Sequence, residues 1–159
     1  MNEFDLIRRY FDRPAADPAV RLAVGDDAAI LAPTPGHELL VSTDMLVCGR
    51  HFFADVDPRA LGHKALAVNL SDIAAMGGAA RWATLAAAWP ELDADWLAAF
   101  AEGWFALADA HEVALIGGDT TRGPLTLSVS IFGEAPAGRA LRRDGGRAGD
   151  DVWVSGELG

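Results

Sequence analysis

Small and apolar residues fill much of the segment 58–76, and apolar residues recur at helical spacing over 94–111, so both segments predict long helices. Pro58 suits the first turn of a helix, and Gly77 follows where that helix is expected to end. Asp93 is a good N-cap for the second helix. The second helix is expected to direct one face inward, made of Trp96, Leu97, Phe100, Trp104, Leu107 and Ala108.

Shorter apolar runs between turn residues predict the remaining elements. Residues 3–11 predict a short helix with Phe4, Ile7 and Phe11 on one side. Alternating or buried patterns predict strands at 21–24, 28–32, 38–43, 82–89, 113–116, 125–132 and 151–155. We therefore expect an α+β fold, with a mixed, largely antiparallel sheet and helices packed on one face. A half-exposed apolar sheet face would favour a partner subunit.

Composition narrows the class of protein. The 159 residues are 51% hydrophobic and 23% charged, which is typical of a globular domain. The net charge of −10 makes nucleic acid an unfavourable partner, because nucleic-acid binding needs a basic surface. No apolar run is long enough to span a membrane, no signal peptide is recognisable, and there is one cysteine, so we expect a cytoplasmic protein. An acidic protein that handles an anionic ligand would need divalent cations to reverse the local charge.

Four acidic blocks are the candidate functional residues: GDD at 25–27, STD at 42–44, NLSD at 69–72 and GGDT at 117–120. Asp72 is unusual because it lies in an apolar helix with no basic residue within a turn. Carboxylates brought together without cations repel one another, so we expect the four blocks to converge around metal ions. Oxygen donors favour Mg²⁺, whereas the scattered histidines and single cysteine disfavour zinc. Each block also has a structural alternative as a turn, a strand-end cap or a solvated helix position.

The absence of known phosphate-binding motifs limits how a nucleotide would be held. The chain contains neither GxxxxGK[ST] nor GxGxxG, so ATP would be bound through metal ions and backbone glycines. His51 follows the STD block and is a candidate ligand contact, although a structural histidine is an equal alternative. The basic residues with candidate roles are Arg50, Lys64, Arg122 and the pair Arg142-Arg143, for which a solvated surface charge is the alternative.

The motifs resemble the thiamine-monophosphate kinase family. The resemblance rests on GDDAAI, VSTDMLVCGRHF, LGHKALAVNLSDIAAMGG, LIGGDTTRGPL and LRRDGGRAGDDVWVSGELG, in the family's order, and covers essentially the whole chain. The GDD and GGDT blocks alone would also fit a wider superfamily that includes aminoimidazole ribonucleotide synthetase, selenophosphate synthetase and a hydrogenase-maturation protein. The sequence departs from the family pattern at Cys48 and Arg50 and in RRDGG.

This resemblance implies an activity and a set of site residues. The family transfers the γ-phosphoryl group of ATP to thiamine monophosphate, and its homodimer joins two sheets in a barrel-like interface. By motif position, the residues that resemble Mg²⁺ ligands are Asp27, Ser42, Thr43, Asp44, Asp72 and Asp119. Gly118, Asp119 and Arg143 resemble ATP contacts, and His51 resembles a contact to thiamine monophosphate. No side chain is expected to act as a general acid or base.

The domain organisation is expected to be incomplete in these 159 residues. We assign residues 1–150 to an N-terminal ATP- and Mg²⁺-binding and dimerisation domain, and residues 151–159 to the start of a truncated C-terminal domain. Two alternatives remain open. The chain could be an inactive dimerisation and nucleotide-binding fragment, or it could belong to another ATP-dependent enzyme of the superfamily with a different acceptor.

Overall fold

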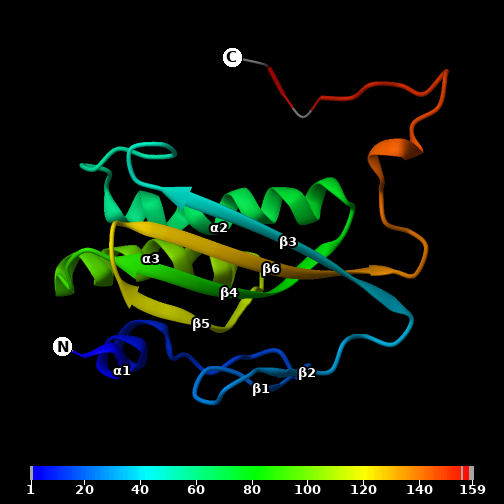
Figure 1. Ribbon diagram of the computed structural model, residues 1–159. Helices are drawn as coiled ribbons and strands as arrows, with labels where there is room; N and C mark the ends of the chain where they lie inside the picture. The colour runs from blue at the N-terminus through cyan, green and yellow to red at the C-terminus, as the bar shows by residue number, and fades with distance from the viewer. Residues whose placement is uncertain (1, 155, 158–159) are drawn as a thin grey trace.

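A four-stranded sheet forms the centre of the computed structural model, which describes residues 2–154 and 156–157 (Figure 1). Its strand order is β3-β6-β4-β5. β6 pairs antiparallel with both β3 and β4, whereas β4 and β5 are parallel. The expected mixed, largely antiparallel sheet is confirmed. Its strands are β3 (His37–Val47), β4 (Ala79–Trp89), β5 (Ala114–Arg122) and β6 (Thr126–Pro136).

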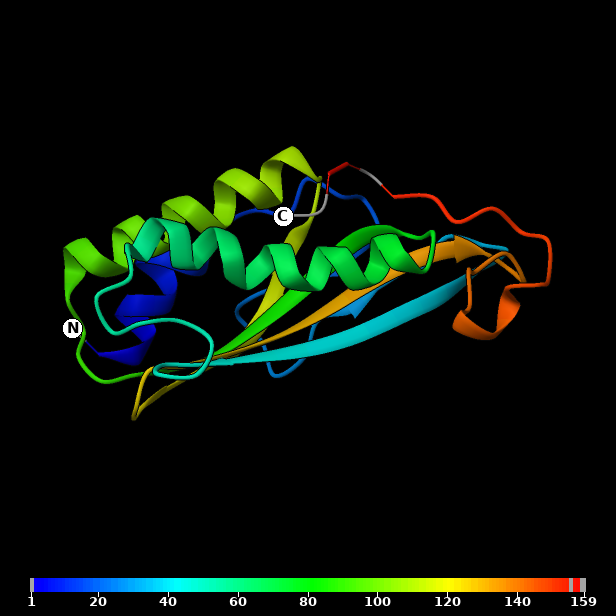
Figure 2. The same ribbon diagram turned by 90° about the horizontal axis from the view of Figure 1, so that it is seen from above.

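Two helices, α2 (Pro58–Ala75) and α3 (Ala94–Ala110), lie together on one side of the sheet (Figure 2). The carboxylate of Asp57 accepts a hydrogen bond from the Ala60 N–H at 3.0 Å, and Asp93 caps α3 in the same way. Both long helices predicted from the sequence are confirmed, because Pro58, Gly77 and the N-cap Asp93 are local signals of helix ends.

The two helices approach each other through glycine. A Cβ atom at Gly62 would overlap the carbonyl oxygen of Phe100, and one at Gly103 would overlap the carbonyl oxygen of Arg59. The backbones therefore touch where the helices pack, which leaves no room for a side chain. This contact sets the position of α2, the helix that carries the NLSD block.

The N-terminal helix differs from the expectation. α1 (Glu3–Leu6) passes into a π-helical turn, η1 (Ile7–Phe11), closed by the Asp12 N–H donating to the Ile7 carbonyl at 2.9 Å. The wider turn shifts the inward-facing positions, so Leu6, Tyr10 and Phe11 are buried while Phe4 is 71% exposed. The predicted face of Phe4, Ile7 and Phe11 was therefore partly wrong. The Phe11 ring stacks on Trp89 at a centroid distance of 6.4 Å.

A separate two-stranded ribbon follows the N-terminal helix. β1 (Val20–Leu22) and β2 (Ile30–Leu31) pair antiparallel with each other, and within the described residues neither strand joins the four-stranded sheet. Figure 1 shows this ribbon beside the β5 edge of the sheet. The GDD block lies between the two strands, at the tip of the ribbon.

Two other expectations need correction. β5 does not stop at Ile116 but continues through the GGDT block, because those residues pair with residues 84–87 of β4. Residues 151–154 do not form the expected strand; Ser155 lies outside the described residues. Val152 and Trp153 are 94% and 87% exposed, so this segment has no neighbour to pair with in the described chain. A 3₁₀ turn, η2 (Arg143–Gly145), precedes it.

Neither α2 nor α3 is both long and apolar enough to cross a lipid bilayer, and no other helix among the described residues is.

Replacing Gly103 tests the helix contact. Gly103→Ala should lower the free energy of unfolding by about 1–3 kcal/mol, because the new methyl group meets backbone that cannot rotate away. Alanine is a better helix former than glycine by roughly 1 kcal/mol, so helix propensity alone predicts a higher free energy of unfolding, whereas the packing clash predicts a lower one. Urea unfolding measures the difference. Gly145→Ala is the matched control, since a Cβ there meets nothing within 4 Å. A more stable Gly103→Ala variant would contradict the close contact.

Candidate functional site

The polar residues of α2 meet β3, which explains their presence in an apolar helix. The Ser42 hydroxyl donates to the Asp72 carboxylate at 2.5 Å, and the Asp44 N–H donates to the Asn69 side-chain oxygen at 3.2 Å. Asn69 is buried, and its amide nitrogen also donates to the Ala65 carbonyl at 3.0 Å. Asn69 and Asp72 are three residues apart, so they share the helix face toward the sheet. The STD and NLSD blocks therefore form one cluster.

Thr43 lies on the opposite face of β3 from Ser42 and Asp44, because strand side chains alternate. Its hydroxyl lies 2.8 Å from that of Ser130 on the neighbouring strand. This is the face that the helices leave uncovered, and the β3 residues Leu39, Val41 and Met45 on it are 50–60% exposed. The STD block is thus divided between the two faces of the sheet.

The GDD and GGDT blocks meet at a cavity of about 810 Å³ beside the β5 edge. Residues 23–29 of the ribbon and residues 115–120 of β5 form two of its walls. The N-terminal helix adds Phe4, Ile7 and Phe11. Asp26, Asp27 and Asp119 therefore line one space although they are about ninety residues apart in sequence.

The backbone conformation and close packing at position 118 require glycine. Its φ of +154° is unusual for a residue with a side chain, and a Cβ there would overlap the Leu85 carbonyl. The pairing of β4 with β5 shifts register between Ala83 and Thr84, just before this contact. The register then places Asp119 beside Ala86, on the exposed face of the sheet.

The hydrogen bonds and the lining of the cavity thus group the four blocks as two pairs within the described residues. Within residues 2–154 and 156–157, no three His, Cys, Asp or Glu side chains form a group suited to a metal ion. The convergence of all four blocks around metal ions stays a prediction. The six ion pairs of the described residues all use other carboxylates, so Asp27, Asp44, Asp72 and Asp119 have no cationic partner there.

His51 lies in the loop that follows β3 and is held by hydrogen bonds with Val47 and Lys64. Its Nδ1 accepts a hydrogen bond from the Val47 N–H at 2.9 Å. Because Nδ1 is the acceptor, the neutral ring carries its proton on Nε2. The Lys64 ammonium donates to the His51 carbonyl at 2.5 Å. The exposed ring is therefore oriented with an N–H donor free for a ligand.

Arg143 is not brought to the other candidate nucleotide contacts. It begins the η2 turn and is exposed. In both views this turn follows β6 beyond one end of the sheet, whereas β5, the strand that contains Gly118 and Asp119, ends at the opposite end (Figures 1 and 2). In this structure Arg143 therefore lies apart from Gly118 and Asp119, although the sequence motifs predict all three as ATP contacts.

A buried charge network was missed by sequence reasoning. The Arg81 guanidinium donates to Asp17 at 2.9 Å and to Glu134 at 3.3 Å. The Trp82 indole N–H also donates to Asp17 at 2.9 Å. Thr34 donates to Glu134 through its N–H at 2.6 Å and its hydroxyl at 2.7 Å. The partners are far apart in sequence, so no local pattern signals them, although a lone carboxylate at 134 in an apolar strand is a hint.

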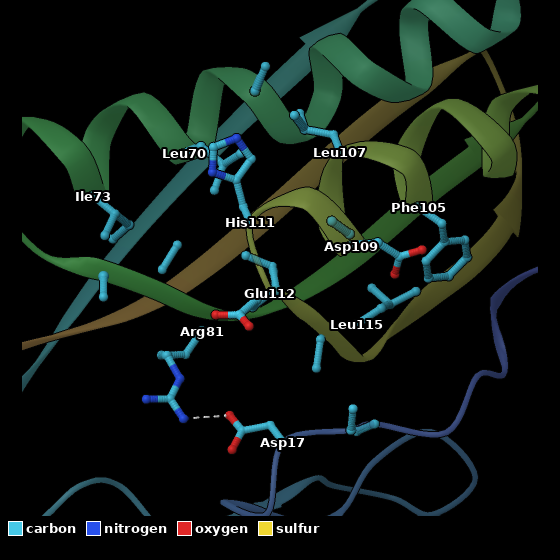
Figure 3. A pocket seen from close by; sticks show the side chains of 18 of the residues that line it. Asp17, Leu70, Ile73, Arg81, Phe105, Leu107, Asp109, His111, Glu112 and Leu115 are labelled. Atoms are coloured by element: carbon cyan, nitrogen blue, oxygen red, sulfur yellow. Dashed lines mark hydrogen bonds and ion pairs between the residues drawn. The ribbon is translucent and has the colours of Figure 1, made fainter.

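This network borders a second cavity, of about 1230 Å³, beside α2, α3 and the N-terminal segment. Figure 3 shows Asp17 and Arg81 facing each other at one side of it, with Glu112 nearby. The side chains of Asp17 and Glu134 are only 10% and 3% exposed. Both carboxylates are therefore satisfied by donors of this chain and are not free for a ligand.

The pKa values of both carboxyl groups lie below their ordinary values. Burial by itself would raise the pKa of Asp17, but hydrogen bonds from the Ala19 N–H, Arg81 and Trp82 outweigh it. Burial likewise opposes a lower pKa for Glu134, and hydrogen bonds from Thr34 with the charge of Arg81 overcome it. The folded chain therefore favours both ionised forms.

Comparisons with known proteins give a consistent result. Residues 25–135 match the family described as AIR synthase related protein, N-terminal domain. A thiamine-monophosphate kinase of Salmonella typhimurium is 51% identical over 158 residues, which cover 99% of this chain and 49% of that protein. The chain thus spans about half the length of the curated relatives it matches.

Solved structures agree with these matches. The crystal structure of thiamine-monophosphate kinase from Stenotrophomonas maltophilia K279a has a TM-score of 0.80 and 50% identity. That match covers 90% of this chain and 45% of that one. AaThiL complexed with AMPPCP and TMP has a TM-score of 0.68 and 31% identity, covering 91% and 44%.

The Asp17–Arg81–Glu134 network predicts how the free energy of unfolding changes at acid pH. Since the folded-state pKa values are lowered, the carboxylates contribute stability above about pH 4, their ordinary range, and lose it as pH falls through the folded values. Arg81→Gln leaves both buried carboxylates without their cationic partner, so the deficit in its free energy of unfolding should be largest at pH 7 and shrink toward pH 3.5. Urea unfolding at several pH values measures this. A deficit that does not change with pH would contradict the ion pairing.

Proposed function

We propose that this chain supplies the nucleotide- and Mg²⁺-binding half of a thiamine-monophosphate kinase. The chain belongs to the family described as AIR synthase related protein, N-terminal domain. The family membership and the high identity confirm the resemblance drawn from the motifs. The proposed reaction moves the γ-phosphoryl group of ATP to the phosphate of thiamine monophosphate, which yields thiamine diphosphate and ADP.

The α2–β3 cluster is the observation that carries the proposal. The hydrogen bond from Ser42 to Asp72 joins two motif residues thirty positions apart. Asp44 lies on the same face of β3, and its backbone is fixed by Asn69. A partly exposed group of carboxylate and hydroxyl oxygens, without a cationic partner in the described chain, is suited to bind a divalent cation.

The donor set of this cluster fits Mg²⁺. This ion takes oxygen ligands and is usually held by one or two carboxylates together with waters and substrate phosphates. The candidate side chains supply only carboxylate and hydroxyl oxygens. Over both pairs of blocks, the residues proposed as ligands by motif position are Asp27, Ser42, Thr43, Asp44, Asp72 and Asp119, with the Thr43 side chain on the other face of β3 from Ser42 and Asp44.

The remaining proposed contacts concern the two substrates. We assign Gly118, Asp119 and Arg143 to ATP and His51 to thiamine monophosphate. AaThiL complexed with AMPPCP and TMP supports a site for a nucleotide and a second phosphorylated ligand in this family. The Nε2–H of His51 suits a phosphate oxygen, because its Nδ1 already accepts from Val47.

The proposed chemistry needs alignment and charge neutralisation. The acceptor is a phosphate oxygen that is already ionised at pH 7, so no side chain has to remove a proton. Bound Mg²⁺ would reduce the repulsion between the two anionic substrates. The role of the chain is to hold its carboxylates at fixed positions, as Ser42 does for Asp72, and to orient the donors.

Assembly and location remain predictions. The exposed face bearing Leu39, Val41 and Met45 is the surface on which a second copy would complete the barrel-like interface of a homodimer. Residues 1–150 as the nucleotide-binding and dimerisation domain, residues 151–159 as the start of a C-terminal domain, and a cytoplasmic location are proposed on the same basis.

Replacing Asp72 tests the metal role. In the full-length protein, Asp72→Asn should lower thiamine-monophosphate kinase turnover about a hundredfold or more and leave the protein folded, since it removes a charge and keeps the shape. Ser71→Ala is the matched control on the same helix, because its hydroxyl bonds only to the Ala67 carbonyl. Turnover within about tenfold of the parent protein would rule out the assigned role.

Ligand-dependent stability tests nucleotide binding separately from turnover. Mg²⁺ with AMPPCP should raise the melting temperature, by an amount equivalent to roughly 2.7 kcal/mol when the nucleotide is at a hundred times its Kd. EDTA should remove the increase. The melting temperatures of the 159-residue chain and of a full-length protein should be measured side by side. A separate activity assay should compare thiamine monophosphate with aminoimidazole and selenide as acceptors. No shift in the full-length protein would oppose the proposal, and turnover with another acceptor would reassign the substrate.

A further inference from the structure

We propose that Arg81 is a positioning residue that, through Asp17 and Glu134, holds the ribbon carrying Asp26 and Asp27 against the sheet. The proposal rests on the function assigned above, because the residues it positions are candidate ligands of metal and nucleotide. It concerns a residue outside the four acidic blocks.

The network fastens the ribbon at both of its ends. Asp17 lies three residues before β1, and Arg81 and Trp82 of β4 both donate to it. Thr34 lies three residues after β2 and donates twice to Glu134 of β6. Arg81 bonds both carboxylates, so a single guanidinium links the two attachment points.

Between these points the ribbon is held mainly by itself. β1 and β2 pair with each other, and the Ala32 N–H donates to the Ala19 carbonyl at 2.8 Å. Within the described residues no strand pairing links the ribbon to β5. Loss of the hydrogen bonds at Asp17 and Thr34 should therefore also displace the tip of the ribbon. There, residues 25–27 line the cavity opposite Gly118 and Asp119.

Burial makes the attachment specific. Asp17 and Glu134 are almost completely buried, and each would be left as an uncompensated charge without Arg81. A lysine at position 81 carries the charge but lacks the forked donors that reach both carboxylates together. The geometry therefore favours arginine at position 81.

The test compares Arg81→Gln and Asp17→Asn with the parent full-length protein. Backbone amide exchange should accelerate across residues 19–32 and stay nearly unchanged in β4 and β6. Asp17→Asn keeps the side-chain shape and leaves the Arg81–Glu134 pair in place, so it provides the measurement if Arg81→Gln does not fold. Arg59→Gln is the control, since it removes only the exposed pair between Arg59 and Glu102.

Kinetics provide the second readout. The KM for ATP and the Mg²⁺ concentration for half-maximal rate should rise about tenfold or more in both network variants, and Arg81→Lys should restore part of the loss. A purely structural role predicts less folded protein with an unchanged KM, which would overturn the proposal. Unchanged exchange in residues 19–32 would also overturn it. If the parent protein binds no nucleotide, the proposed function fails, and the exchange result still decides the inference.

Discussion

The contact between α2 and β3 is the constraint on which the candidate site depends. Leu61, Leu66 and Ile73 bury the apolar side of the helix, and the glycine contact with α3 limits where it can lie. With the helix placed in this way, Asn69 is buried and satisfied by Ala65 and Asp44. Asp72 then reaches Ser42 at the edge of the packed region. The helix is apolar because it must pack, and it carries one carboxylate because that position meets the sheet.

The same division between packing and polar contact occurs at the N-terminal segment. Phe11 joins the aromatic cluster of Trp89 and Phe100, which holds η1 by apolar contact. The ribbon that follows has few buried apolar residues and is held instead by the Asp17–Arg81–Glu134 network. Because a buried ion pair depends on exact geometry, it fixes position more strongly than it adds stability. On the proposed function, such an attachment suits a segment that presents carboxylates to a metal ion.

Local signals made part of this structure predictable. Pro58 and Gly77 located the two ends of α2, and Asp93 with the apolar spacing located α3, because helix ends are determined within a few residues. The strand order and the network were not predictable, since Asp17 and Arg81 are sixty-four positions apart with no shared pattern. The motifs named a set of candidate site residues, which stays a prediction, and they did not indicate how the fold groups those residues. Alternation along β3 separates Thr43 from Ser42 and Asp44, a consequence of strand geometry that motif spacing does not express.

The grouping of the acidic blocks in two pairs has a chemical consequence. One pair lies between α2 and β3, and the other lines the cavity between the ribbon and β5. Each pair contributes fewer oxygen ligands than the six of an octahedral Mg²⁺ site, so waters and phosphate oxygens would have to supply the rest. On the proposed function, metal affinity is therefore linked to nucleotide binding: the cation is held weakly until the anion arrives. An acidic chain of net charge −10 would repel a free nucleotide, and the same linkage explains how it could bind one, since the cation and the anion enter the site together.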